Sequence, residues 1–146
     1  MKVLLQRVSR AQVSVDGRVV GSIDAGLLLL VGIGHGDGAD QLEWMAHKVV
    51  NLRVFADADG KMNRSVLDAG GGVLAVSQFT LYADSSKGNR PSYIDAAPPE
   101  QAVALYEQFC TLLETKLAKP VARGVFGAHM HVELVNDGPV TIMLER

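Results

Sequence analysis

The stretch GLLLLVGI, residues 26–33, is a continuous apolar run with the length of one strand. A strand that is exposed on one face alternates between apolar and polar residues, whereas this run does not alternate. Such a pattern is typical of a strand that is covered on both faces inside a sheet. We therefore expect residues 26–33 to lie at the centre of the sheet.

The segment before this run, residues 3–23, predicts two antiparallel strands. It alternates loosely between apolar and polar residues, and it contains Asp16-Gly17 between flanks rich in β-forming residues. An Asp-Gly pair in this context is the strongest short-range signal for a two-residue hairpin turn. The fold is thus expected to begin with a hairpin.

Two helices are predicted from apolar residues that recur at helical spacing. The first follows the glycine-rich residues 32–38, with Asp40 as the expected N-cap and Glu43 three residues later; its apolar residues are Leu42, Met45, Val49 and Leu52. The second begins at Pro98-Pro99 and ends before Pro120; its apolar residues are Ala102, Leu105, Phe109, Leu112 and Leu113.

The remaining segments predict further strands, at residues 53–57, 71–83, 129–135 and 140–144. The last two are joined by the turn-forming residues Asn136-Asp137-Gly138-Pro139, which stand directly against regular structure. Together these elements predict one α+β domain, residues 1–146, with mostly antiparallel pairing.

Composition limits the classes of protein to consider. The chain is 48% hydrophobic and 21% charged, which fits one globular domain, and no apolar run is long enough to span a bilayer. We expect a soluble, cytoplasmic protein in which the single cysteine, Cys110, is a buried thiol. The net charge of −2 gives no global attraction to nucleic acid, so an RNA partner would have to meet a local basic patch.

A glycine cluster offers one alternative function, a nucleotide-binding module. The glycines at positions 32, 34, 36 and 38 lie between the predicted central strand and the first helix, where a dinucleotide-binding loop would lie. The spacing departs from the fingerprint, and Asp37 would repel a pyrophosphate. Asp57 and Asp59 lie near the place of a ribose-binding acid but suit a turn equally well.

The sequence contains no established metal or hydrolase motif. The four histidines, of which His129 and His131 would share one strand face, lack the spacing of a zinc site, so we expect neither metal nor cofactor. There is no G-x-S-x-G elbow and no serine, histidine and acid constellation. A hydrolase built from this sequence would therefore need another mechanism.

The stretch SQFTLYAD, residues 77–84, precedes a basic and aromatic loop that contains Lys87, Arg90 and Tyr93. Taken alone, these residues favour a strand followed by a solvated loop. A functional interpretation is also open: Lys87 and Arg90 would hold phosphates, while Thr80 and nearby main-chain N–H groups would meet the carbonyl of an ester.

Two motifs carry a resemblance to a known family. SQFTLYAD and NDGPVT, residues 136–141, resemble the two signatures of the D-aminoacyl-tRNA deacylase family. Further segments resemble the family in the same order, namely QRVSRAQVSVDG, RVFADADGKMN, KGNRPSY and GVFGAHMHVELVNDGPVT. The resemblance covers essentially the whole chain. Tyr93 and Tyr82 depart from the residues common at these positions, phenylalanine and a small residue.

The resemblance implies an activity and a partner. It implies a barrel-like core of mostly antiparallel strands with two main helices packed outside. The chain would act as a homodimer that hydrolyses the ester between a D-amino acid, or glycine, and the terminal adenosine of tRNA. No cofactor, membrane or DNA is implied. A non-catalytic RNA-binding protein remains the second alternative.

The resemblance also implies roles for individual residues. The bond matching Gly138-Pro139 is cis in the family and enters the partner's pocket, although residues alone favour trans. The main-chain N–H groups of Gln78, Phe79 and Thr80 would polarise the ester, with Thr80 either a nucleophile or a positioning group. Lys87 and Arg90 would bind the acceptor stem. The supporting residues would be Arg7, Ser77, Asn136, Val140 and Thr141.

Overall fold

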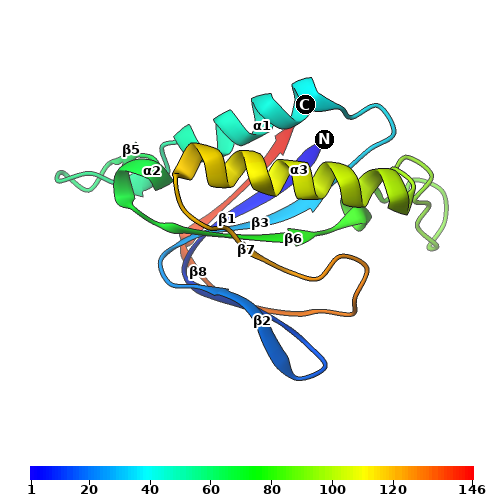
Figure 1. The fold of residues 1–146 in the computed structure, drawn as a ribbon, viewed down its shortest axis with the longest axis horizontal. Coiled ribbons are helices and arrows are strands. Elements are labelled where there is room, and N and C mark those ends of the chain that lie inside the picture. Colours follow the sequence, from blue (N-terminus) through cyan, green and yellow to red (C-terminus); the bar gives the residue numbers. More distant parts are fainter.

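Strand β3 (Gly26–Gly32) runs through the middle of a six-stranded sheet, as its apolar run predicts. In this computed structural model, which describes residues 1–146, β3 pairs antiparallel with β1 (Lys2–Val15) and parallel with β6 (Gly72–Ser77). The order β2-β1-β3-β6-β7 is completed by β2 (Arg18–Ile23) and β7 (Ala122–Arg123). The sixth strand, β8 (His131–Glu145), pairs with β1 (Figure 1).

The sheet curls into a nearly closed barrel. Strand β1 is long enough to pair with β2 and β3 on one side and with β8 on the other. The two ends of the strand order then meet, because Gly21 of β2 lies against the backbone of Arg123 in β7: a Cβ atom on Gly21 would lie 2.7 Å from the Arg123 carbonyl oxygen. The predicted α+β barrel with two main outer helices is confirmed, with the addition that the β3–β6 and β6–β7 pairs are parallel.

Two apolar cores explain why the central run does not alternate. Leu27 and Leu29 of β3 face the helices and belong to the larger core. Leu28 and Leu30 face the opposite way, into the smaller core inside the barrel. Both faces of β3 are therefore covered, and every position of the run is apolar.

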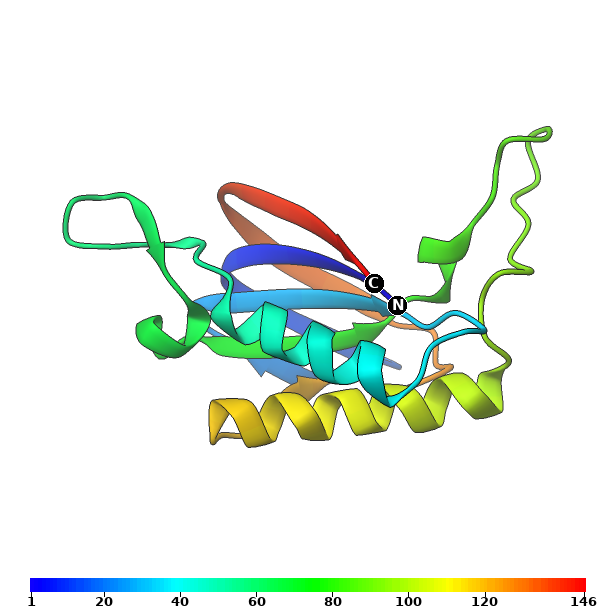
Figure 2. The same cartoon turned by 90° about the horizontal axis from the view of Figure 1, so that it is seen from above.

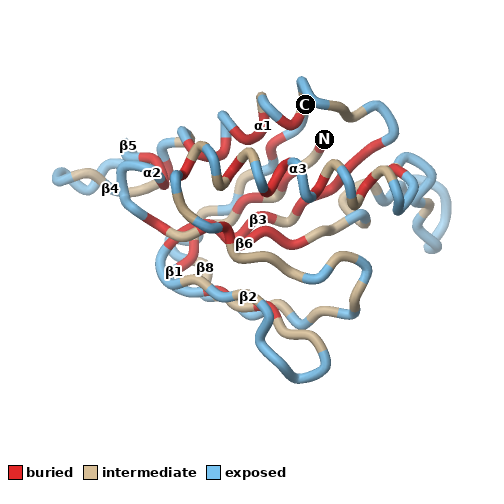
Figure 3. The backbone as a smooth tube through the Cα atoms, viewed as in Figure 1, coloured by how far each residue is buried: buried red, intermediate tan, exposed pale blue.

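The helices α1 (Ala39–Asn51) and α3 (Pro99–Leu117) lie side by side over one face of the sheet (Figure 2). Their buried sides face the strands and their exposed sides face solvent (Figure 3). The prediction for α3 is confirmed, whereas Asp40 is not the N-cap of α1. Gly38 precedes the helix instead, and its N–H donates to Gln41 Oε1 at 3.1 Å. No helix is both long and apolar enough to cross a membrane.

Cys110 is buried on α3, as predicted. Burial raises the pKa of its thiol to about 11, so the group stays protonated at neutral pH. On the same helix, the buried Tyr106 hydroxyl donates to the Ala75 carbonyl oxygen of β6 at 2.9 Å. This bond joins α3 to the sheet within the larger core.

Two predicted strands differ in the structure, and one short helix was not predicted. The strand expected over residues 71–83 ends at Ser77, and a 3-10 turn, η1 (Phe79–Tyr82), follows. The strand expected over 53–57 is reduced to β4 (Phe55–Ala56), which pairs with β5 (Met62–Arg64) in a separate hairpin. A short helix, α2 (Val66–Ala69), was not predicted; Ser65 and Asp68 cap it reciprocally.

The two strands predicted at residues 129–135 and 140–144 are one continuous strand, β8. Both halves pair with β1, and the turn-forming residues between them leave the ladder and return to it. A turn within one strand gives the same local signals as a turn between two strands, so residue patterns alone do not separate the two cases.

We expect Gly26→Ala to destabilise the fold severely. A Cβ atom on Gly26 would lie 2.0 Å from the Gly72 carbonyl oxygen, so β3 and β6 would have to separate. The free energy of unfolding should fall by about 3 kcal/mol, measured by urea denaturation.

Gly36→Ala is the matched control, because nothing lies within 4 Å of a Cβ atom there and its φ is not positive. Equal urea midpoints for the two variants would contradict the close approach of β3 and β6.

Candidate active site

A pocket of about 290 Å³ opens where β6 ends. Ser77, Gln78 and Phe79 form one wall, and the segment 126–130 before β8 forms the facing wall. The lining is completed by Val31 at the end of β3, Ile33 just after it, Val76 of β6, Val132 of β8, and Ala102 and Tyr106 of α3. The SQFTL motif thus contributes directly to a concave site.

The end of β6 leaves two main-chain donors unpaired. Gln78 N–H donates to the Val31 carbonyl oxygen at 2.7 Å, which extends the β3–β6 pairing by one bond. The chain then turns into η1, and the N–H groups of Phe79 and Thr80, at the start of this turn, have no hydrogen-bond acceptor. Of the three donors expected from the sequence, the structure leaves Phe79 and Thr80 free and occupies Gln78.

The Thr80 hydroxyl has no base beside it. Its one hydrogen-bond partner is Gln78 Nε2, which donates to Thr80 Oγ1. A hydroxyl nucleophile needs a neighbouring group that takes its proton. An amide does not do so, and this contact therefore suits a positioning role for both side chains.

An aromatic pair borders the pocket. The rings of Phe79 and Tyr93 meet edge to face with centroids 5.1 Å apart, and Phe79 remains 56% exposed. Residues 84–92 form an extended loop beside this pair, closed by two hydrogen bonds between Asp84 and Ser92. The loop projects away from the body of the fold (Figure 2), and Lys87 lies exposed on it. Arg90 is exposed on the same loop.

Residue types alone did not reveal the facing wall of the pocket. It is formed by Phe126, Gly127, Ala128, His129 and Met130. This segment belongs to a stretch quoted for its family resemblance, yet it contains no residue type that indicates chemistry, apart from a histidine expected to pack. Its small and apolar residues contribute shape.

The Gly138-Pro139 turn is an excursion from β8. Gln6 of β1 pairs with Thr141 and Val8 pairs with Asn136, so two steps along β1 correspond to five along β8. Residues 137–140 therefore project from the sheet while β1 runs straight past them. The Gly138-Pro139 peptide bond is cis, as the family resemblance implies.

Arg7 holds this turn at its base. Its Nε donates a hydrogen bond to the Asp137 carbonyl oxygen at 3.1 Å. The same Nε forms an ion pair with the Asp137 carboxylate, 3.1 Å from Oδ2. Arg7 Nη1 donates to the Val54 carbonyl oxygen, and a Cβ atom on Gly138 would lie 2.7 Å from Nη2. The Arg7 side chain is only 13% exposed, so the turn rests on a fixed guanidinium.

Asn136 and Thr141 close the neck of the turn. Asn136 Nδ2 donates to the Val140 carbonyl oxygen at 3.1 Å and approaches Thr141 Oγ1 at 3.4 Å. Gln6 Nε2 donates to the same hydroxyl at 3.2 Å. Val140 packs against the larger core. The structure thus unites Arg7, Asn136, Val140 and Thr141 around Gly138-Pro139.

The turn and the pocket do not meet within one chain. The turn lies opposite Arg7, which pairs with Leu27, whereas the pocket begins at Ser77, which pairs with Val31. The path from the turn to the pocket therefore covers four residues along β3, at about 3.3 Å each, and three steps across the sheet from β8 to β6, at about 4.8 Å each. Together these displacements separate the turn from the pocket by about 20 Å. In Figure 2 the bend of β8, where orange passes into red, lies away from the green turn of η1.

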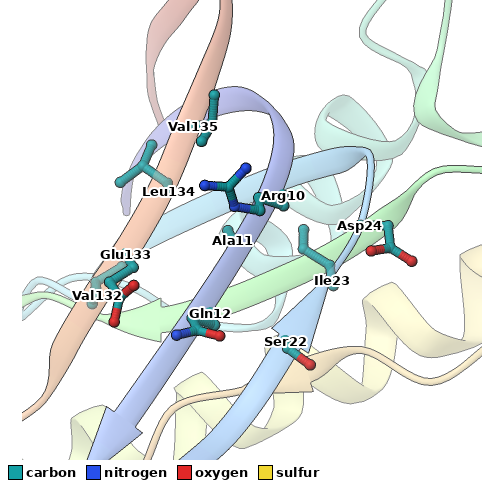
Figure 4. Close-up of a pocket in the computed structure, with 10 residues that line it drawn as sticks. All are labelled: Arg10, Ala11, Gln12, Ser22, Ile23, Asp24, Val132, Glu133, Leu134 and Val135. Atoms are coloured by element: carbon teal, nitrogen blue, oxygen red, sulfur yellow. The ribbon is translucent and has the colours of Figure 1, made fainter.

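A second hollow, of about 730 Å³, lies over β1 between β2 and β8 (Figure 4). Arg10 and Gln12 of β1 stand on its floor, with Glu133 on one side and Asp24 on the other. None of the residues predicted for the site lines it.

The glycine cluster forms a closed loop. Gly34 N–H donates to Asp37 Oδ2 at 2.7 Å, and the ammonium group of Met1 forms an ion pair with the same carboxylate. A Cβ atom on Gly34 would lie 2.7 Å from Tyr82 Oη, so the glycine makes room for this ring. The donor and the space that a phosphate would need are occupied by Asp37 and Tyr82, which argues against the nucleotide-binding alternative. Burial raises the pKa of Tyr82.

Comparisons with known proteins agree on one family. The family model described as D-Tyr-tRNA(Tyr) deacylase matches residues 4–145. A "D-aminoacyl-tRNA deacylase" from Thermomicrobium roseum is 62% identical over 145 residues, covering 99% of this chain and 94% of the relative. A protein of the same description from Chloroherpeton thalassium is 59% identical, covering 99% and 95%.

Solved structures share the fold. A structure described as "c-Myc DNA Unwinding Element Binding Protein" matches with a TM-score of 0.94 at 44% identity, covering 100% of this chain and 99% of that chain. A probable eukaryotic D-amino acid tRNA deacylase matches with a TM-score of 0.83 at 17% identity, covering 98% and 97%, which is a likeness of fold. Because the family model and the 62% identical relative both span nearly the whole chain, the chain belongs to the D-aminoacyl-tRNA deacylase family.

Proposed function

We propose that this protein is a homodimeric, cytoplasmic editing enzyme that hydrolyses D-aminoacyl-tRNA and glycyl-tRNA and rejects L-aminoacyl-tRNA. Family membership supports the ester hydrolase activity on D-aminoacyl-tRNA. The observation that carries the finer proposal is the separation of the Gly138-Pro139 turn from the pocket at Ser77–Thr80. Two half-sites on one chain form a whole site when a second chain supplies the missing half.

A two-fold dimer satisfies this requirement for both chains at once. An isologous interface brings the turn of each protomer to the pocket of its partner. Strand β8 pairs with β1 alone, so its other edge is open, and Val135 and Met143 on it are 39% and 48% exposed. Natural sheets cover or pair such an edge. The 730 Å³ hollow beside β8 gives the partner a further surface to fill.

Stereochemical selection then rests on the main chain of the turn. The carbonyl oxygens around Gly138-Pro139 would accept hydrogen bonds from the α-amino group of the substrate. The side chain of an L-amino acid would point into these atoms and clash, whereas a D side chain or the hydrogen of glycine would not. This arrangement excludes the wrong substrate by repulsion rather than by weaker attraction.

Catalysis is proposed to use main-chain donors and the substrate itself. The N–H groups of Phe79 and Thr80 would polarise the ester carbonyl and stabilise the charge that develops on its oxygen. The 2′-hydroxyl of the terminal ribose would assist the attack of water. The Phe79 ring is half exposed and offers a stacking surface for the terminal adenine. Lys87 and Arg90 would hold acceptor-stem phosphates beside the pocket.

A deacylation assay with matched D-tyrosyl-, L-tyrosyl- and glycyl-tRNA tests the proposal. We expect free tyrosine or glycine to be released from the D- and glycyl substrates, while the L-tyrosyl ester persists at its spontaneous rate. Binding of charged tRNA without loss of its amino acid would instead support the non-catalytic RNA-binding alternative. Hydrolysis of the L-ester at the same rate as the D-ester would contradict selection by the turn.

We expect Thr80→Ala to retain D-tyrosyl-tRNA deacylation within about tenfold of the unmodified protein, because the main-chain N–H of residue 80 survives the substitution. Removal of a covalent nucleophile would cost several orders of magnitude. Single-turnover deacylation distinguishes these outcomes.

Thr111→Ala is the control, since the hydroxyl of this exposed threonine on α3 donates only to the Glu107 carbonyl oxygen of its own helix. An acyl-enzyme trapped on Thr80 of the unmodified protein would restore Thr80 as the nucleophile.

We expect Arg7→Lys to lower kcat/KM for D-tyrosyl-tRNA roughly 10- to 100-fold, because a misplacement of about 1 Å is costly in a preorganised site. A lysine ammonium cannot reproduce the fork that contacts Val54 and Asp137 together. The ratio of D- to L-ester hydrolysis should fall as well, since the turn would be less firmly held.

Arg18→Lys makes the same chemical change on β2, where the arginine is exposed and forms no ion pair. It should leave rate and selectivity unchanged. An Arg7→Lys protein with full activity and selectivity would remove Arg7 from the proposed machinery.

A further inference from the structure

A groove of about 580 Å³ lies on the outer face of α1, between the second half of this helix and the β4–β5 hairpin. Trp44, His47 and Lys48 of α1 line it, and Arg53 and Met62 close its far end. We call it the Trp44 groove. It shares no residue with the pocket at Ser77–Thr80.

The charges in the Trp44 groove are all positive. Its charged lining residues are Lys48 and Arg53, and no carboxylate lines it. Neither cation forms an ion pair: Lys48 Nζ lies 5.9 Å from the centroid of the Trp44 ring, and Arg53 Nη1 donates to Asn63 Oδ1 at 3.2 Å. The Arg146 guanidinium adds a further charge, 5.4 Å from the same ring.

Cations elsewhere on the helices are neutralised. Lys116 of α3 forms an ion pair with Glu43. Arg123 after α3 binds two carboxylates, at 2.6 Å to Glu107 and 2.8 Å to Glu114. The chain has a net charge of −2, so the three cations around Trp44, none of which pairs with a carboxylate, form a locally positive surface. Cations beside a partly buried aromatic ring and polar side chains suit the sugar-phosphate backbone of a nucleic acid.

The position of the groove relates it to the Gly138-Pro139 turn. Arg53 directly precedes Val54, and the Val54 carbonyl oxygen accepts a hydrogen bond from Arg7 Nη1. Arg7 in turn holds Asp137 at the base of the turn. One end of the groove is therefore fixed beside the turn. If the turn enters the partner's pocket, as the proposed function requires, the groove lies at the mouth of that pocket.

We infer that the Trp44 groove of one protomer binds the backbone phosphates of the tRNA acceptor arm whose aminoacyl end occupies the partner's pocket. This inference rests on the proposed function. Each tRNA would then contact both protomers: the loop with Lys87 and Arg90 on the protomer that supplies the pocket, and Lys48 and Arg53 on the protomer that supplies the turn.

The first test removes the two cations. Lys48→Ala with Arg53→Ala should weaken tRNA binding roughly tenfold at 0.15 M salt, and it should reduce the slope of log Kd against log salt by about 0.7–0.9 for each cation. The ratio of kcat/KM for D-tyrosyl-tRNA to kcat/KM for the D-tyrosyl ester of adenosine should fall by the same factor, because the adenosine ester has no acceptor arm.

Arg18→Ala with Lys116→Ala is the matched control, since it removes two positive charges from β2 and α3. An equal fall of tRNA affinity in the control would show that net charge alone matters, and it would overturn the inference that the Trp44 groove binds tRNA. An unchanged salt slope in the Lys48 and Arg53 variant would overturn it as well.

Mixed dimers, purified through two different tags, test whether the groove acts on the partner's pocket. The pocket is inactivated by Phe79→Pro, which removes the Phe79 ring and one of the two main-chain donors at the first position of η1. When pocket and groove substitutions lie on the same protomer, the intact pocket faces a damaged groove, and its kcat/KM for D-tyrosyl-tRNA should fall about tenfold. When they lie on opposite protomers, the intact pocket faces an intact groove and activity should match that of a dimer with the pocket substitution alone.

The reverse pattern, or equal activities in the two mixed dimers, would overturn the inference while leaving the proposed function intact. Failure of the proposed function gives a different result: no mixed dimer would form, or the unmodified protein would leave the adenosine ester uncut. The two failures are therefore separable.

Discussion

The contact between Arg7 and the Gly138-Pro139 turn is the constraint on which the rest of the structure depends. Strands β1 and β8 pair over almost their full length, yet their apolar residues change core along the way. Leu134 packs inside the barrel, whereas Ile142 packs under the helices. The ladder is interrupted at this crossover, and β8 uses the interruption to project four residues. Arg7 fills the gap and converts a break in the sheet into a rigid projection.

The pocket also owes its main features to the way in which a strand is interrupted. Strand β6 ends where its last bond to β3 is made, and the following turn leaves two N–H groups without acceptors. Main-chain donors of this kind need no proton transfer and no reorganisation when charge develops on a substrate oxygen. A site of this type contains no catalytic side-chain constellation for a motif search to find. The chemistry proposed for it depends on the residue at which β6 ends.

How much of this was predictable differs between elements for physical reasons. The central strand was predicted because burial on both faces requires a continuous run of apolar residues. Helix α3 was predicted because burial of one face places apolar residues at helical spacing. The end of β6 at Ser77 was not predicted, because the residues FTLY that follow have the composition of a strand. Only the loss of pairing with β3 ends the strand there. The continuity of β8 was not predicted either, because a turn inside a strand and a turn between two strands have the same composition. Gly138, Pro139 and Arg7 came from family resemblance, and no local pattern connects Arg7 to a turn 130 residues away.

Net charge is a poor guide to this protein's surfaces because its ion pairs are unevenly distributed. Carboxylates neutralise Lys116 and Arg123 near the end of α3, so these charges contribute little field beyond a Debye length of about 8 Å at physiological salt. Among the cations that form no ion pair, two groups lie near the candidate site: Lys87 and Arg90 on the loop after η1, and Lys48, Arg53 and Arg146 around Trp44. In one chain these places flank different half-sites, the pocket and the turn. In the proposed dimer the two half-sites would join, and the two basic surfaces would join into one track. The proposal thus gives one explanation for both the charge pattern and the separation of the half-sites.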